Sequence, residues 1–236
     1  MAVRFDNSAD NLRRTTSLPS TNTYSVCFWG KLSSDQNYYS TFFGFTDGSS
    51  LYSVLETNLD GITVLWADNG GTGNIRTLTV GEWYFFGITK SNTDVVIYVA
   101  AATDANLTAT NFSDNASTPA HTLLTLGDDG FSEPLDGCIA AFKMWDGVAL
   151  SAAEVAAERW QVMPARTSGL YAWLPMTDAS GIDYSGTGHS FTVNGTLSAE
   201  DGPPIAWKKG ASRLFIPPPA GGGAPANTTN FFQFFN

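Results

Sequence analysis

Apolar and polar residues alternate in short runs along most of the chain, and Gly, Asn and Asp interrupt these runs at intervals of roughly ten residues. In residues 24–31, Tyr24, Val26 and Phe28 occupy every second position, which is the spacing of side chains on one face of a β-strand. Repeated strand-length runs with turn residues between them are typical of an all-β protein. The pattern therefore predicts many short strands.

Two pairs of these runs are predicted to be adjacent strands. Residues 53–58 and 62–67 flank an Asp-Gly pair at 60–61, which supplies the positive φ that a tight hairpin turn requires. Residues 83–89 and 95–99 are apolar on both faces, so we expect both faces of these strands to be covered. Together the two pairs predict a two-sheet antiparallel β-sandwich.

One short helix interrupts the strand pattern. Ser151 and Glu154 form a capping box, in which each side chain binds the backbone N–H of the other residue. We expect the helix to continue through residues 155–161, for about two turns. Strand-like residues resume at 169–174 and 190–193, so the fold class remains all-β.

Charge narrows the range of partners. The chain has 22 acidic and 12 basic residues and a net charge of −10, so it repels nucleic acid phosphates and anionic lipids. The longest wholly apolar stretch, residues 95–102, is far shorter than the roughly 20 residues of a membrane-spanning helix. We therefore expect no nucleic acid partner and no membrane partner. Whether Cys27 and Cys138 form a disulfide stays open.

The composition changes after residue 215. Residues 216–226 are mainly Pro, Gly and Ala, which cannot form a core and are typical of a linker. Residues 227–236 contain four phenylalanines, each of which contributes about 2 kcal/mol when buried. We expect a globular domain at residues 1–215, followed by the linker and an extended C-terminal docking peptide. Its docking residues are Phe231, Phe232, Phe234 and Phe235.

Three pairs of segments carry a family resemblance. They are residues 83–90 with 95–99, residues 135–145 with 149–155, and residues 169–176 with 183–189. In that order they resemble two paired strands, a late strand with its short helix, and a strand-and-turn segment of laminin-G-like, concanavalin A-like jelly rolls. The third segment is similar to bacterial and phage members. The resemblance implies a jelly roll, but this fold hosts lectins, glycosidases and structural domains, so it does not by itself imply a function.

No catalytic constellation is visible. Retaining glycosidases place two carboxylates about 5 Å apart, and no glutamate here pairs with an aspartate at strand spacing. The chain has no Gly-x-Ser-x-Gly turn, and His121 and His189 are interpreted as solvent-facing loop residues. We therefore expect no enzyme activity.

Two loops are candidates for ligand binding. Asp128, Asp129 and Asp136 could supply oxygen ligands to calcium, which the resembled fold often holds at a loop rim, although Asp and Gly also simply form turns. A saccharide needs an exposed aromatic ring beside polar side chains. Trp66 and the loop after it could provide this, with Asp68, Asn69 and Asn74 as polar partners. Trp29, Trp83, Trp145 and Trp173 are assigned to packing.

Two hypotheses of different class follow. The first is a non-enzymatic display module that the Phe-rich peptide anchors to a larger, oligomeric assembly; the phage resemblance implies a virion protein, as capsid decoration or tail-associated, with other virion proteins as partners. If the source is not viral, we expect an extracellular protein, although residues 1–6 show no secretory signal pattern. The second is a glycan-binding adhesion module, with calcium as its candidate ion. A glycoside-active enzyme ranks below both.

Overall fold

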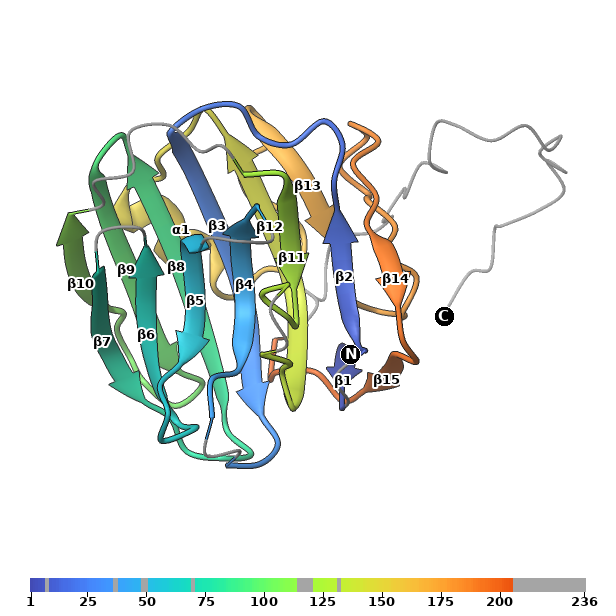
Figure 1. Cartoon of the computed structure of the whole chain (residues 1–236). Helices are drawn as coiled ribbons and strands as arrows, with labels where there is room; N and C mark the ends of the chain where they lie inside the picture. The colour runs from blue at the N-terminus through green and yellow to red at the C-terminus, as the bar shows by residue number, and fades with distance from the viewer. Residues whose placement is uncertain are drawn as a thin grey trace, which may run out of the picture.

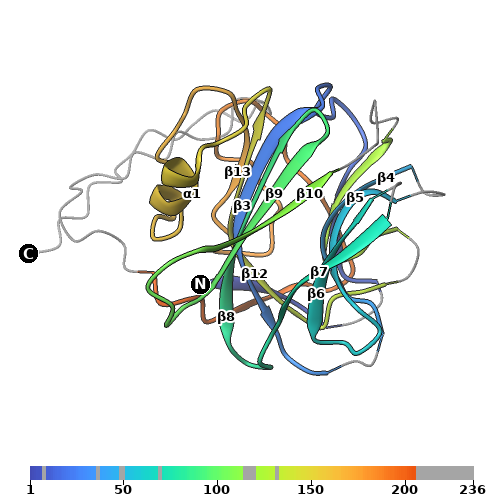
Figure 2. The same cartoon turned by 90° about the vertical axis from the view of Figure 1, so that its left-hand side faces the viewer.

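The computed structural model describes residues 1–6, 9–35, 38–47, 51–68, 71–113, 121–130 and 133–205. Within them, two antiparallel β-sheets lie face to face, and a helix packs outside one of the sheets (Figures 1 and 2). The predicted all-β sandwich with a short helix is confirmed. The predicted domain end at residue 215, the linker and the docking peptide lie outside the described residues.

The first sheet has the strand order β10-β9-β8-β3-β12-β1-β15, with β13 paired to β12. In that order its strands are β10 (Thr108–Ser113), β9 (Asp94–Ala101), β8 (Trp83–Ser91), β3 (Thr23–Leu32), β12 (Gly137–Asp146), β1 (Ala2–Phe5), β15 (Ser198–Glu200) and β13 (Leu170–Leu174). Strands far apart in the sequence are therefore neighbours, and β1 is held between β12 and β15.

The second sheet has the order β14-β2-β11-β4-β5-β6-β7. Its strands are β14 (Thr192–Asn194), β2 (Asn11–Arg14), β11 (Leu123–Leu126), β4 (Thr41–Thr46), β5 (Leu51–Thr57), β6 (Thr63–Asp68) and β7 (Gly71–Thr77). The predicted hairpin is confirmed as β5–β6. In its turn, Asp60 Oδ1 accepts hydrogen bonds from the backbone N–H groups of Ile62 and Thr63 at 3.0 and 2.7 Å, and Gly61 has a φ of +71°.

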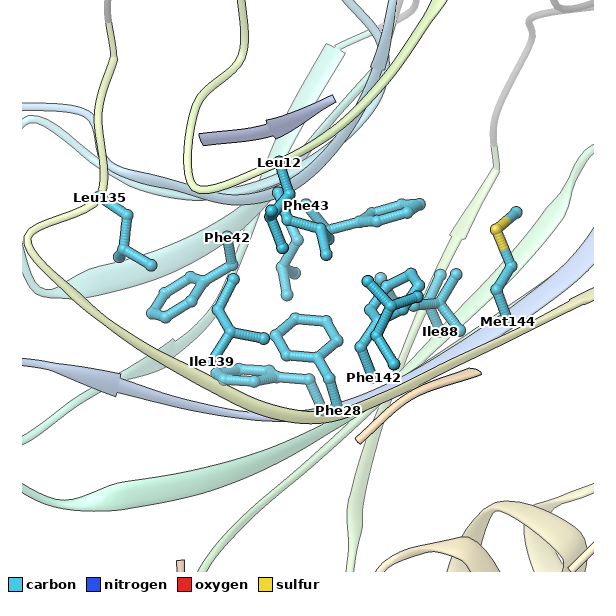
Figure 3. Packing of buried hydrophobic residues seen from close by; sticks show 14 of the residues in the cluster. Leu12, Phe28, Phe42, Phe43, Ile88, Leu135, Ile139, Phe142 and Met144 are labelled. Atoms are coloured by element: carbon cyan, nitrogen blue, oxygen red, sulfur yellow. The ribbon is translucent and has the colours of Figure 1, made fainter. Parts of the chain in front are cut away.

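The main core lies between the sheets and is rich in phenylalanine (Figure 3). Tyr24, Val26 and Phe28 of β3 all face it, as their alternation predicts. Phe86 of β8 lies against Phe28, with ring centroids 5.4 Å apart. Its neighbour Phe85 points to the opposite side and belongs to a second apolar cluster, so β8 is covered on both faces as expected.

The second cluster lies between the first sheet and α1 (Ala152–Glu158). Trp29 and Phe85 contribute from the sheet, and Val155 contributes from the helix. Gly87 allows this close approach, because a Cβ atom there would lie 2.4 Å from Val155 Cγ1. The predicted capping box at the start of α1 is confirmed: the Glu154 N–H donates to Ser151 Oγ, and the Ser151 N–H donates to Glu154 Oε2.

The helix ends at Glu158, three residues earlier than expected, and the side chain of Glu158 contacts both the first sheet and the segment that follows. Its Oε2 accepts a hydrogen bond from Lys143 Nζ at 2.7 Å, and both side chains are 1% exposed. Its Oε1 accepts the backbone N–H groups of Ala165 and Arg166, at 2.8 and 3.1 Å. This buried ion pair therefore fixes both the end of α1 and the segment that follows it.

Two further points concern the described residues alone. Cys27 and Cys138 are buried and free, which answers the question that the sequence left open. Burial raises the pKa of both thiols, for Cys138 to about 12. No helix in the described part is long and apolar enough to cross a membrane.

Candidate functional site

The acidic residues nominated as calcium ligands lie on the segment that joins β11 to β12. This segment is fixed against the second sheet, because the Gly127 N–H donates to the Phe42 carbonyl oxygen at 3.3 Å. Gly127 also has a φ of +82°, and a Cβ atom there would lie 2.4 Å from the ring of Phe5. The position therefore requires glycine, and the acidic side chains that follow it start from a fixed backbone.

Asp128 is bound to the second sheet. Its Oδ2 pairs with the Arg13 guanidinium at 3.1 Å and lies 3.4 Å from the side-chain amide nitrogen of Asn11, and its Oδ1 accepts the Gly130 N–H. Asp128 is only 3% exposed, so this carboxylate stabilises the segment from within the protein. It has no solvent-facing oxygen to offer as a surface ligand.

Asp136 has different partners. Its carboxylate pairs with Arg4 of β1 and accepts a hydrogen bond from the Ser34 hydroxyl. The structure therefore ties Asp136 to the first sheet and Asp128 to the second. Over the described ranges, no group of three or more His, Cys, Asp or Glu side chains is arranged to hold a metal ion. Among the described residues, Asp128, Asp129 and Asp136 therefore do not form the predicted calcium site.

A different set of carboxylates forms the candidate site, which we call the acidic cluster: Glu56, Asp129 and Glu133. Glu56 lies on β5 next to Leu55, which faces the main core, so the Glu56 side chain points to the outer face of the second sheet. Asp129 Oδ1 accepts the backbone N–H of Glu133 at 3.2 Å. Glu56 and Asp129 are 3% and 1% exposed, so two of the three carboxyl groups are almost fully buried.

The electrostatics of the acidic cluster favour protonation. Burial, the charge of Glu133, a hydrogen bond with Glu133 and the charge of Asp129 raise the pKa of Glu56 to about 9. Burial and the charge of Asp129 also raise the pKa of Glu133. Among the described residues, Glu56 Oε2 and Glu133 Oε2 have no hydrogen-bond partner, and the same holds for the buried hydroxyl of Thr41, which pairs with Glu56 in the strand register. At neutral pH the cluster therefore holds a proton.

This arrangement does not suit glycoside hydrolysis. A glycosidase needs about 5 Å or more between its two carboxyl groups, with the sugar between them. Here Glu56 and Glu133 are in hydrogen-bonding range, and Glu56 is 3% exposed. The acidic cluster can bind a proton, but no sugar ring fits between its carboxyl groups. Sequence analysis missed it because its residues are spread over 78 positions, from Glu56 to Glu133, with no recognisable spacing.

The predicted glycan site at Trp66 requires a correction. Trp66 is 1% exposed and belongs to the main core, so its ring is not a surface platform. The physical reason is strand alternation, because β6 extends through Asp68 and directs Trp66 inward and Leu65 outward. Asn74 is exposed and pairs with Leu65 in the register, so it lies on the opposite face from Trp66. Asp68 is the last residue of β6, and Asn69 lies outside the described residues.

The remaining nominated residues have these outcomes. His121 packs on Phe45 with ring centroids 4.4 Å apart, and His189 stacks on Tyr171 at 4.0 Å, so both histidines contact structural partners. Trp29 and Trp145 are buried, as predicted for packing residues. The docking residues Phe231, Phe232, Phe234 and Phe235 lie outside the described residues and stay a prediction.

The sheet order, the phenylalanine core and the outer helix define a two-sheet sandwich of the jelly-roll class. A family model described as the concanavalin A-like lectin/glucanases superfamily matches residues 6–156, which is more than half of the chain. The chain belongs to this superfamily, and the family predicted from the sequence is confirmed. Comparison with curated protein sequences gives no match.

Solved structures with the same fold come from distant proteins. A protein named for a proposed carbohydrate-binding role, from Bacteroides ovatus, is 18% identical with a TM-score of 0.61, covering 87% of this chain and 61% of that one. A heptameric SAP-like pentraxin from Limulus polyphemus is 16% identical with a TM-score of 0.55, covering 83% and 92%. The enzymatically active domain of tailspike protein 2 from bacteriophage CBA120 is 15% identical with a TM-score of 0.53, covering 73% and 29%. At these identities the similarity shows the fold alone.

Proposed function

We propose that this chain is a non-enzymatic display head on the surface of a virion, where the Phe-rich segment at residues 227–236 anchors it to other virion proteins. The observation that carries the proposal is the closure of the folded head. Strand β15 pairs with β1, and β1 pairs with β12, so residues near both ends of the described part meet at one edge of the first sheet (Figure 1). Strands from near both ends of the described part are therefore held in one folded unit.

Side chains reinforce the closure at β15. Glu200 pairs with Lys31 Nζ at 2.5 Å and accepts a hydrogen bond from Cys138 Sγ at 3.2 Å. These contacts join β15 to β3 and β12, so the last described strand is fixed to the rest of the first sheet. We propose that the four phenylalanines that follow the Pro- and Gly-rich linker bind the partner, at about 2 kcal/mol for each ring buried.

The non-enzymatic part of the proposal has separate support. Glu56 and Glu133 have raised pKa values, but they lie too close together and too deeply for two-carboxylate hydrolysis. The head is therefore proposed to serve as a stable surface unit, and the Phe-rich segment is proposed to determine which assembly carries it.

Light scattering behind a sizing column tests the anchor. The comparison uses the full chain, a chain ending at Phe215, and a full-length variant in which Phe231, Phe232, Phe234 and Phe235 are all replaced by Ser. We expect the full chain to self-associate and the other two to elute as monomers with the same melting temperature. The serine variant keeps the length and the linker, so it isolates the effect of the phenyl rings.

Two results would overturn the proposal. If all three chains are identical monomers, the Phe-rich segment is not an assembly element. If mass spectrometry of purified particles of the source virus does not detect the chain, the head is not a virion component.

A further inference from the structure

A groove of about 260 Å³ lies between α1 and the loop that joins β9 to β10, on the outer side of the first sheet. Figure 2 shows α1 on this side, away from the second sheet. The residues that shape the groove are mainly apolar: Tyr98, Leu107, Ala152, Ala156 and Trp160, with Asn106 as a polar member. A closed cavity of about 150 Å³ holds a benzene ring, so this groove has room for a phenyl group.

The groove is built on a fixed apolar layer. Tyr98 and Leu107 pack against the second cluster, which lies between the first sheet and α1. The Trp160 side chain is 42% exposed, and its ring centroid lies 5.4 Å from that of Trp29. Trp29 is itself fixed, because its Nε1–H donates to the Arg159 carbonyl oxygen at 2.8 Å. The exposed indole ring of Trp160 can therefore pack against a further aromatic ring without a rearrangement beneath it.

The groove suits an uncharged ligand. Arg159 is the one charged residue that lines its described part, and this residue is 2% exposed. Its Nη2 donates to the carbonyl oxygens of Ala101 and Asp104 at 2.6 and 2.8 Å. A charged ligand would lose hydration in such a groove without gaining a partner. Residues 227–236 contain four phenylalanines and no Asp, Glu, Lys or Arg, so the Phe-rich segment matches the groove in apolar character and in charge.

The chain that follows the described part starts on the same side of the head as the groove. Ile205, the last described residue, packs against the second cluster, as Tyr98 and Leu107 of the groove do. Residues 206–226 can span about 70 Å when extended, whereas a folded head of this size has a diameter on the order of 40 Å. The Phe-rich segment can therefore reach the groove of a neighbouring head.

We propose that this groove binds the Phe-rich segment of a second copy of this chain. A phenyl ring of the segment lies on Trp160, beside the small side chains of Ala152 and Ala156, and the Gln233 amide exchanges hydrogen bonds with Asn106. The inference rests on the proposed role of the Phe-rich segment in assembly, and it adds a second copy as a partner.

The position of the groove favours a closed dimer. Because the groove and the start of the segment lie on one side of the head, two copies that face each other can exchange segments, and this contact closes on itself with two-fold symmetry. Once one segment is bound, the second binds within the same pair, so two exchanged segments hold the dimer more tightly than one.

Light scattering behind a sizing column tests the exchange with two complementary full-length variants. Ala156→Glu places a longer, charged side chain in the groove, whereas the serine variant described above removes the four phenyl rings of the segment. We expect the full chain to be a dimer and each variant alone to be a monomer. Ala156→Glu should weaken the dimer at least about tenfold, because the contact would bury a charge in an apolar groove. A mixture of the two variants should form a mixed dimer, since one intact groove then meets one intact segment.

Ala157→Glu is the matched control. Ala157 is exposed on the same helix as Ala156, and it is not among the residues that line the described groove. This variant should dimerise as the unaltered chain does, and both Glu variants should keep its melting temperature. Groove occupation is then separated from a general effect of a new charge on α1.

Three results would contradict the inference. If Ala156→Glu dimerises as tightly as Ala157→Glu, the segment binds elsewhere, although the proposed role of the segment in assembly still holds. If the full chain dimerises but the mixed variants stay monomeric, the two heads do not exchange segments. If the full chain is a monomer like the serine variant, the inference and the proposed anchoring fail together.

Discussion

The groove beside α1, which Asn106 and Trp160 line, and the acidic cluster beside β5 both contain polar groups without partners among the described residues, but the exposure of these groups differs. In the groove, Arg159 is buried with its Nη2 bonded to backbone carbonyl oxygens, whereas the Asn106 amide is exposed. In the acidic cluster, the atoms without partners, such as Glu56 Oε2, are buried. Polar groups that lack a partner and face solvent can bind a ligand. Buried carboxyl groups that face one another have raised pKa values, and burying them without partners lowers the stability of the fold.

The two regions also differ in what lies beneath them. The groove rests on a layer in which Lys143 and Glu158 form a buried ion pair that fixes the end of α1. In the acidic cluster, the carboxyl groups of Glu56 and Glu133 have raised pKa values, so their protonated forms are favoured over the charged forms. At neutral pH, a substitution that breaks the ion pair should therefore lower the stability of the fold, whereas one that removes a carboxyl group of the acidic cluster should raise it.

The largest effect is expected for Lys143→Met. Removing the ammonium leaves the Glu158 carboxylate buried without its partner, and breaking one side of a buried ion pair costs about 3–5 kcal/mol. The free energy of unfolding, measured with urea at pH 7, should fall by that amount.

A double variant, Lys143→Met with Glu158→Gln, provides the control. It removes both charges while keeping hydrogen-bonding atoms for the N–H groups of Ala165 and Arg166. We expect it to be more stable than Lys143→Met alone. If the single variant loses less than about 1 kcal/mol, the pair behaves as a surface ion pair, which contradicts its burial in the structure.

Much of the fold could be predicted because it depends on local patterns. The alternation of Tyr24, Val26 and Phe28 places β3 correctly, and the Asp-Gly pair at 60–61 predicts the β5–β6 hairpin. The same patterns fail at Trp66. Each residue from Ile62 to Ala67 except Thr63 is apolar, so the sequence does not distinguish the inner face from the outer face. Only the pairing with β5 and β7 determines that Trp66 points inward.

The sites could not be predicted from the sequence, because they depend on tertiary contacts. Tyr98, Asn106 and Trp160 meet only after α1 packs against the first sheet, and no spacing relates them. Trp160 falls inside the helix that the sequence predicts through residue 161, so the sequence does not mark it as exposed. Asp129 is the one residue of the acidic cluster that the sequence analysis nominates, as a candidate calcium ligand. Its partner Glu56 comes from a strand 73 residues earlier in the chain.

The second-largest effect is a gain in stability, and it is expected for Glu56→Gln. The folded pKa of about 9 lies above the unfolded value of about 4.3, so the stability that Glu56 contributes is full below about pH 4.3 and is lost as the pH rises towards 9. Gln cannot ionise and mimics the protonated acid. Relative to the unaltered chain, the variant should gain on the order of a few kcal/mol between about pH 5 and pH 9.

Urea midpoints at about pH 5, 7 and 9 measure this gain. Glu82→Gln is the matched control, because Glu82 is an exposed glutamate whose Oε2 accepts a hydrogen bond from the Tyr84 hydroxyl. As a surface substitution, its free energy of unfolding at pH 7 should lie within about 0.5 kcal/mol of that of the unaltered chain. If the difference between Glu56→Gln and the unaltered chain does not change from pH 5 to pH 9, the description of the acidic cluster as proton-binding is wrong.

The smallest effect is expected for Ser151→Ala, which removes the side chain that caps α1. The Glu154 N–H loses its acceptor and Glu154 Oε2 loses the Ser151 hydroxyl, so the free energy of unfolding should fall by about 1 kcal/mol. Ser151→Thr keeps the capping hydroxyl and should retain the stability of the unaltered chain. Equal losses in the Ala and Thr variants would show that the helix start is not fixed by the cap, and the groove would then have to be positioned from the end of α1, by Lys143 and Glu158 alone.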